Sequence, residues 1–94
     1  MSETIWKYEL QITDYQTIHM PELAEILCVQ VQLGRPHLWV LVHSGKKKEP
    51  RKIAIHGTGH DIPPGERYIG TVQTNQGSLV WHVFEVPPGP EGQR

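Results

Sequence analysis

Residues 25–43 read EILCVQVQLGRPHLWVLVH and carry the clearest structural signal in the chain. Leu38, Val40 and Val42 lie on one face of the second half, because alternate residues of a β-strand point to the same side. A turn at 33–37, which contains a glycine and a proline, separates the two apolar halves. The stretch therefore predicts a β-hairpin with one strand on each side of this turn.

The alternation of apolar and polar residues recurs on both sides of this hairpin. Residues 4–12 form an apolar face that consists of Trp6, Tyr8, Leu10 and Ile12. Further strands are expected at 17–19, 51–56, 67–74 and 79–86, the last two joined by a turn at 75–78. At most one helical turn is expected, at 21–25, because Pro and Gly interrupt every longer apolar period. The sequence thus predicts an all-β fold, a small antiparallel sandwich or barrel of six to seven strands.

The chain is short enough for one hydrophobic core. Its 94 residues predict a single β-rich domain at 1–86. The tail at 87–94 reads PPGPEGQR and offers nothing to bury, so we expect it to be disordered. Cys28 is the only cysteine, which excludes an internal disulfide. It alternates in phase with Ile26, and we expect it to be a small buried apolar residue on the same face.

The charge balance and the lack of long apolar runs exclude several classes of protein. Nine basic and ten acidic residues give a formal net charge of −1, whereas a general nucleic-acid binder needs a strong basic excess. No run of about 18 apolar residues predicts a membrane span, and residues 1–20 show no secretory signal. We therefore expect a cytoplasmic protein. Unpaired strand edges in so small a domain predict a homo-oligomer.

Residues 55–61 read IHGTGHD and contain the most informative candidate site. Glycine lets a ligand approach the backbone closely, and successive N–H groups in such a loop can bind an anion. The candidate ligand-binding residues here are His56, Gly57, Thr58, Gly59 and His60. They predict a cradle for the phosphate or ribose of a small anionic ligand, with no cofactor and no catalytic residue. The alternative is that the glycines only turn the chain where the strand ends.

Two residues outside this loop extend the candidate site. Arg51 opens the strand that leads into the loop, so its guanidinium is expected to reach an anion held there. Trp39 shares a strand face with His37 and His43 rather than with the apolar residues. A tryptophan with polar neighbours suits a platform for a planar base or a subunit interface.

Two other functions stay open. His56, His60 and Asp61 are possible metal ligands within six residues, which makes a metal-dependent hydrolase one alternative. The spacing of these three residues neither favours nor excludes a metal site, because no predicted helix would bring their side chains to one face. The other alternative is a protein–protein interaction module that uses the exposed aromatic face and a sheet edge.

Several separated runs resemble a family of short bacteriophage and prophage proteins of unknown function. The runs are IWKYEL at 5–10, MP at 20–21, AEIL at 24–27, VQVQ at 29–32, GTGH at 57–60, YIGT at 68–71 and VFE at 83–85. The resemblance covers about residues 4–85 and implies no role for any residue. It implies a phage accessory protein in the bacterial cytoplasm. By analogy of size and setting, such a protein would sequester a nucleotide-derived immune signal of the host.

Overall fold

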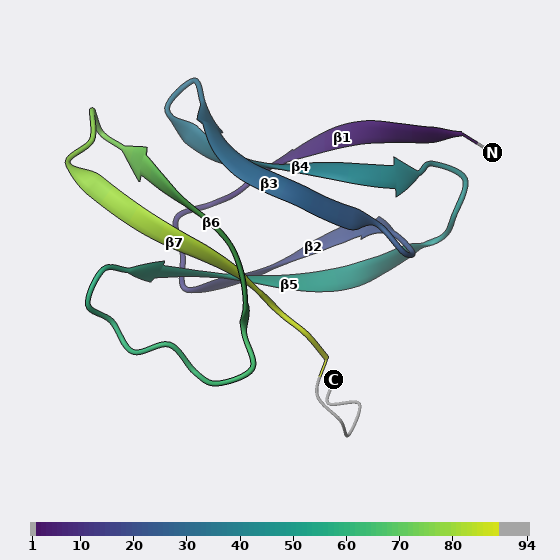
Figure 1. Cartoon of the computed structure of the whole chain (residues 1–94). Helices are drawn as coiled ribbons and strands as arrows, with labels where there is room; N and C mark the ends of the chain where they lie inside the picture. Colours follow the sequence, from purple (N-terminus) through teal and green to yellow (C-terminus); the bar gives the residue numbers. More distant parts are fainter. Residues whose placement is uncertain (1, 89–94) are drawn as a thin grey trace.

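Two antiparallel sheets make up the computed structural model, which describes residues 2–88 (Figure 1). The strands are β1 (Glu3–Glu9), β2 (Tyr15–Pro21), β3 (Glu25–Gln32), β4 (Arg35–His43), β5 (Lys48–Gly57), β6 (Arg67–Thr74) and β7 (Leu79–Val86). The smaller sheet has the order β1-β4-β3, and the larger sheet has the order β2-β5-β7-β6. The predicted all-β class is confirmed. The described strands form a sandwich, and the sheets do not close into a barrel.

The hairpin of β3 and β4 forms as the sequence predicts, but with a tighter turn. Gln32 pairs with Arg35, so Leu33 and Gly34 alone make the turn, with φ angles of +54° and +79°. Two successive positive φ angles are typical of a type I′ turn, whose twist matches that of the strands it joins. The hairpin of β6 and β7 is also confirmed, with its turn at 75–78.

A β-bulge in β3 changes which side chains face the core. Ile26 pairs with Val40, but Cys28 pairs with Trp39, so Leu27 is an extra residue in the strand. Val40 is fully buried between the sheets, whereas Trp39 lies on the opposite, outer side of β4. Cys28 is therefore half-buried on the outer face. The expectation that it shares the inner face with Ile26 is wrong.

One apolar core fills the space between the two sheets. Its buried members are Leu10, Met20, Ala24, Val29, Leu38, Val40, Val42, Ile53, Ile55, Val72 and Val83. Each fully buried aliphatic side chain contributes about 2 kcal/mol relative to leaving it exposed. The sheets approach each other closely where β3 meets β6, because a Cβ added at Gly70 would lie 2.8 Å from Val29 Cγ1. The core leaves little room at that contact.

One local possibility is not realised, and one local expectation is wrong. Residues 21–25 form no helical turn: the Ala24 N–H donates to the Pro21 carbonyl (3.2 Å), and Leu23 has a φ of +64°. This is a tight β-turn between β2 and β3. Ile12 lies beyond the end of β1 and is 47% exposed, so the apolar face ends at Leu10, the residue that follows the strand.

The other expectations concern the extent of two strands, the C-terminal tail and membrane spans. The short strand expected at 17–19 exists as β2, and the strand expected at 51–56 is longer, as β5. Most of the tail expected at 87–94 lies outside the described residues, which end at Pro88. Nowhere in residues 2–88 is there a helix long and apolar enough to cross a membrane.

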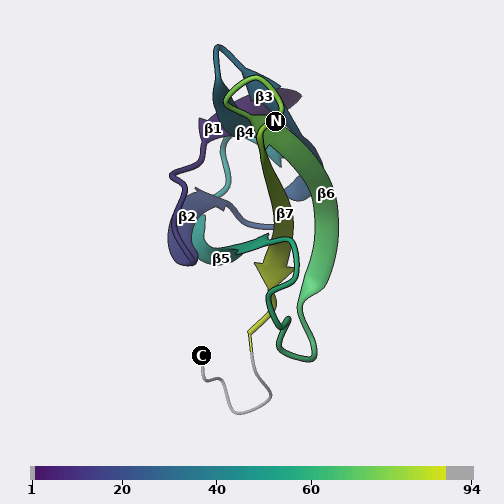
Figure 2. The ribbon, with the colours of Figure 1, turned by 90° about the vertical axis from the view of Figure 1, so that its left-hand side faces the viewer.

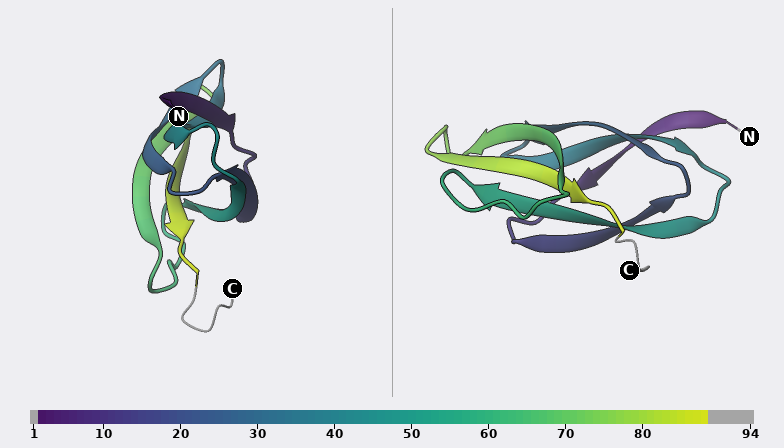
Figure 3. Two further views of the ribbon diagram at one scale, coloured as in Figure 1. Left: turned by 90° about the vertical axis from the view of Figure 1, so that its right-hand side faces the viewer. Right: turned by 60° about the horizontal axis from the view of Figure 1, so that its bottom comes forward.

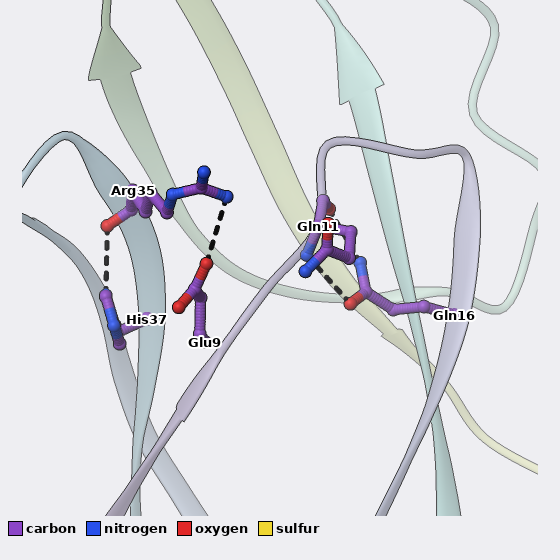
Figure 4. A network of polar contacts seen from close by, with 5 residues as sticks. All are labelled: Glu9, Gln11, Gln16, Arg35 and His37. Carbon is purple, nitrogen blue, oxygen red and sulfur yellow. Dashed lines mark hydrogen bonds and ion pairs between the residues drawn. The ribbon is translucent and has the colours of Figure 1, made fainter.

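Strand β1 lies at the margin of the sandwich in both views of Figure 3. Its C-terminal end is tied to β4, because Arg35 Nη1 donates to Glu9 Oε2 (3.0 Å; Figure 4). Just beyond it, the Gln16 side chain accepts from the Gln11 N–H (3.0 Å) and donates to the Gln11 carbonyl (2.8 Å). These contacts fix the connection that carries the chain from the smaller sheet to the larger one.

Replacing Gly70 with Ala is expected to lower the free energy of unfolding by about 1–3 kcal/mol, because the new Cβ overlaps Val29. In a Val29→Ala background the obstruction is gone, and the same change should cost much less. Urea denaturation of the wild type, both single variants and the double variant measures the coupling. An equal cost of Gly70→Ala in both backgrounds would contradict this packing.

Candidate functional site

The glycine loop begins at the end of β5 and forms a turn. Gly57 still pairs with Trp81 of β7, and the His60 N–H donates to the Gly57 carbonyl (3.2 Å). Gly59 has a φ of +91°, a conformation that glycine adopts without strain. The His60 ring lies over Gly57, where an added Cβ would be 3.2 Å from His60 Cε1. The glycines therefore do turn the chain, and a ligand role for them stays a prediction.

Thr58, the residue between the two glycines, belongs to a network of side-chain hydrogen bonds. Its hydroxyl is 2.8 Å from His82 Nε2, and His82 Nδ1 is 2.9 Å from the Thr71 hydroxyl. The Tyr68 hydroxyl is 2.6 Å from that of Thr71. A neutral imidazole donates from one nitrogen and accepts at the other, so both ring nitrogens of His82 are used by threonine hydroxyls. This fixes the orientation of the His82 ring on β7.

His56 lies in a second, more buried network on the same sheet. Its Nε2 is 2.7 Å from Glu66 Oε1, and the two side chains are 9% and 3% exposed. The Tyr15 hydroxyl donates to Glu66 Oε2 (3.2 Å). Desolvation and then the Glu66 charge raise the pKa of Tyr15. The His56 ring nitrogen that faces Glu66 is thus engaged inside the protein.

Both networks lie on the outer face of the larger sheet. His56 pairs with His82 across β5 and β7, next to the inward-facing Ile55 and Val83. The Phe84 ring packs edge-on between His56 and Tyr68, with centroids 5.5 Å and 5.4 Å away. We call this surface the β5–β7 face and define it by Tyr15, His56, Tyr68, Thr71, His82 and Phe84. The connection at 58–66 loops out at one end of it (Figure 2).

Arg51 lies in the first half of β5, away from the glycine loop. Gly57 is six positions further along the strand, which corresponds to about 20 Å. Its Nε and Nη2 donate to the Glu85 carboxylate (Nη2–Oε1 3.1 Å), and its Nη1 donates to the Ala24 carbonyl (3.0 Å). The hydrogen bond to Glu85 raises the pKa of Arg51. Arg51 therefore joins β5 to β7 and to the turn before β3.

Two cavities flank the Arg51–Glu85 pair. A cavity of about 350 Å³ lies between the start of β3 and strands β6 and β7, and Tyr68 and Ile69 are among its lining residues. A larger groove of about 800 Å³ is lined by Thr17, Glu49, Pro50, Arg51, Lys52, Arg67, Glu85, Val86, Pro87 and Pro88. Lys52 connects this groove to the β5–β7 face, because its Nζ lies 4.7 Å from the centroid of the Tyr15 ring.

Trp39 lies in the smaller sheet, on the far side of the sandwich from the β5–β7 face. The Lys7 Nζ is 5.8 Å from the centroid of its ring. Its Nε1 is buried and has no hydrogen-bond acceptor among residues 2–88. The predicted site residues thus fall in three places: the loop and its network, the Arg51 groove, and the outer face of the smaller sheet. The structure does not bring the three together.

The metal ligands considered above are also separated. His56 is turned toward Glu66, and His60 lies over Gly57. Across the part of the chain that the structure describes, no three side chains of His, Cys, Asp or Glu are grouped closely enough to hold a metal ion.

The ligand-binding residues proposed from the sequence do not include Thr71, His82, Glu66 or the two exposed tyrosines. Thr71 and His82 stand directly opposite each other in the β6–β7 hairpin, whose turn the sequence predicts. Counting outward from that turn would have paired them, since cross-strand partners share a face. The contact of Glu66 with His56 has no such local signal, because it depends on the path of the long connection.

Comparisons with known proteins give one match. A family model described as "Domain of unknown function (DUF7352)" matches residues 1–93. No curated protein and no solved structure matches the chain.

Replacing Arg51 with Met is expected to lower the free energy of unfolding by about 3 kcal/mol, because the buried Glu85 carboxylate loses both close hydrogen bonds and keeps only the Arg67 guanidinium, at 3.7 Å. The double variant Arg51→Met with Glu85→Leu removes both charges and should recover much of the loss. Urea denaturation tests this. A double variant as unstable as the sum of the single ones would argue against a buried ion pair.

Replacing Glu66 with Gln should lower the pKa of Tyr15, because a negative charge that opposes tyrosinate is lost. The wild-type contribution of Tyr15 to stability is present below its ordinary pKa of 10.0 and is lost as pH rises through the raised folded value. NMR titration of tyrosine labelled at Cζ measures the shift. Tyr8 is the internal control, because burial alone raises its pKa. A Tyr15 pKa unchanged by Glu66→Gln would contradict the contact.

Proposed function

We propose that this chain, which belongs to the DUF7352 family of domains of unknown function, binds a small anionic ligand with a planar ring, such as a nucleotide. One observation supports this above all. A groove of about 800 Å³ lined by Arg51, Lys52 and Arg67 leads, through Lys52, to a sheet face with exposed tyrosine rings. The ligand lies along this groove and the β5–β7 face.

The groove supplies the positive charge for the anion. Its cations are Arg51, Lys52 and Arg67, and its carboxylates are Glu49 and Glu85. Glu85 is satisfied by Arg51, and the Arg67 Nη1 stays 3.7 Å from it with a side chain that is 65% exposed. Lys52 and Arg67 are therefore the side chains with donors to offer, and a guanidinium binds phosphate oxygens in pairs. Arg51 serves indirectly by neutralising the carboxylate beside them.

The β5–β7 face supplies the surface for the planar ring. Tyr15 is 42% exposed and Tyr68 is 58% exposed, so both rings offer area on which a base can stack. His82 orders the hydroxyls of Thr58 and Thr71, and the Thr71 hydroxyl also bonds to Tyr68. Both hydroxyls can exchange partners with a ribose or a base edge. The glycine loop thus contributes through Thr58, at the rim of the site.

The finer proposal concerns the source of the ligand. The chain acts as a phage accessory protein in the bacterial cytoplasm and sequesters a nucleotide-derived immune signal of the host without cleaving it. Two considerations support this: the residue runs that resemble short phage proteins, and a site whose chemistry suits a phosphorylated planar molecule.

Titration calorimetry with cyclic dinucleotides, ADP-ribose and inorganic phosphate tests the proposal. A nucleotide should bind, and Arg67→Gln should weaken it about tenfold or more by removing a charge-assisted hydrogen bond. Tyr68→Ala should weaken it by a similar factor through loss of stacking. Lys47→Gln is the matched control, since Lys47 is an exposed lysine outside the lining of the groove.

The outcomes separate the proposal from its alternative. No heat from any probe, or an equal loss in Lys47→Gln, would count against the groove. Trp39→Ala should leave nucleotide affinity unchanged, because Trp39 lies on the other sheet. If the wild type binds no nucleotide but captures a partner protein, and Trp39→Ala abolishes that capture, the chain is a protein–protein interaction module instead.

A further inference from the structure

Strand β1 has an open edge. It is the outermost strand of the order β1-β4-β3, and none of residues 2–88 pairs with its free side (Figure 1). The opposite margin of the same sheet is different, because β3 lies against β6. An unpaired edge presents N–H and C=O groups that can pair with another strand.

The register with β4 shows which residues of β1 present these groups. In an antiparallel pair, residues that exchange both backbone hydrogen bonds alternate with residues that exchange none. The Leu10 N–H donates to the Pro36 carbonyl (2.9 Å), and the Ser44 N–H donates to the Ser2 carbonyl (3.4 Å). Even-numbered residues therefore bond to β4. The odd-numbered residues Glu3, Ile5, Lys7 and Glu9 direct their N–H and C=O toward the open edge.

Charge selects one way for two such edges to pair. A two-fold axis must bring odd-numbered residues opposite odd-numbered ones. Among such registers, those that pair at least five residues of each β1 strand have the axis beside Ile5, Trp6 or Lys7. An axis at Lys7 places two lysines together, and an axis at Trp6 places Glu3 opposite Glu9 of the partner subunit. An axis at Ile5 places Glu3 opposite Lys7 of the partner subunit on both sides. Opposite charges directly across a ladder attract, and like charges repel.

Ile5 and Glu3 fit the same register as they stand, whereas Lys7 must turn from its hydrogen bond with Gln32 toward the edge. Ile5 is 55% exposed at the middle of the strand, and at the axis it would pack against its own copy. Glu9 is already paired with Arg35 (Figure 4). Glu3 lies 3.4 Å from His43 Nε2 with a side chain that is 56% exposed, so it can still reach a lysine.

We propose that β1 pairs with β1 of a second copy of this chain, antiparallel and centred on Ile5. The two copies then share one continuous sheet through about six new backbone hydrogen bonds. This dimer is independent of the ligand site, which lies on the other sheet. In this dimer, the second copy covers the open edge of β1.

Charge reversal tests the register. The wild type should dimerise as its concentration rises in sedimentation or light-scattering measurements. Glu3→Lys and Lys7→Glu should each weaken the dimer about tenfold, because each turns two attractive pairs into repulsive ones. The double variant Glu3→Lys with Lys7→Glu should restore it. An equimolar mixture of the two single variants should form a heterodimer in which every cross-strand pair attracts.

Two control variants show whether a change in dimerisation comes from the edge of β1. Lys47→Glu makes the same charge change away from β1 and should leave the dimer intact. Ile5→Pro removes an edge N–H that β4 does not use, and should give a folded monomer by circular dichroism. A wild type that stays monomeric at every concentration would overturn the proposal. A dimer that Glu3→Lys strengthens would overturn the Ile5 register, because it would mean that Glu3 faces another carboxylate.

Discussion

The whole structure depends on one constraint: each strand has two faces, and the inner faces of both sheets pack into one shared apolar core. The Cα atoms extend over 42 × 34 × 16 Å, so the sandwich is thin. Leu38, Val40 and Val42 of β4 are fully buried because they alternate in phase with the core. Chemistry is therefore confined to the outer faces, the open edges and the ends where the two sheets part.

The larger sheet carries most of the candidate functional side chains. Its outer face holds two hydrogen-bonded networks, one around His82 and one around His56, with aromatic rings packed between them. In the first half of β5, Arg51 pairs with Glu85 of β7, and Lys52 and Arg67 line the groove beside this pair. Aromatic surface and positive charge thus meet on one side of the molecule, joined through Lys52 and Tyr15.

Period-two patterns predicted most of the strands and both hairpins, since alternation is a local property of the chain. They missed the bulge at Leu27, which moves Cys28 to the outer face, because one extra residue leaves no mark in composition. The candidate site was predicted in part. Thr58 does lie in a polar network, but Trp39 and Arg51 are far from it. Their separation follows from strand order and sheet membership, which alternation does not encode.

Mapping of a bound nucleotide by NMR tests the central claim most directly. Backbone amide shifts are followed while a cyclic dinucleotide is added to the labelled protein. Binding on the larger sheet predicts that the changes concentrate at Lys52, Arg67 and Tyr68 and leave the smaller sheet unaffected. Changes centred on Trp39, or none with any nucleotide, would contradict the account.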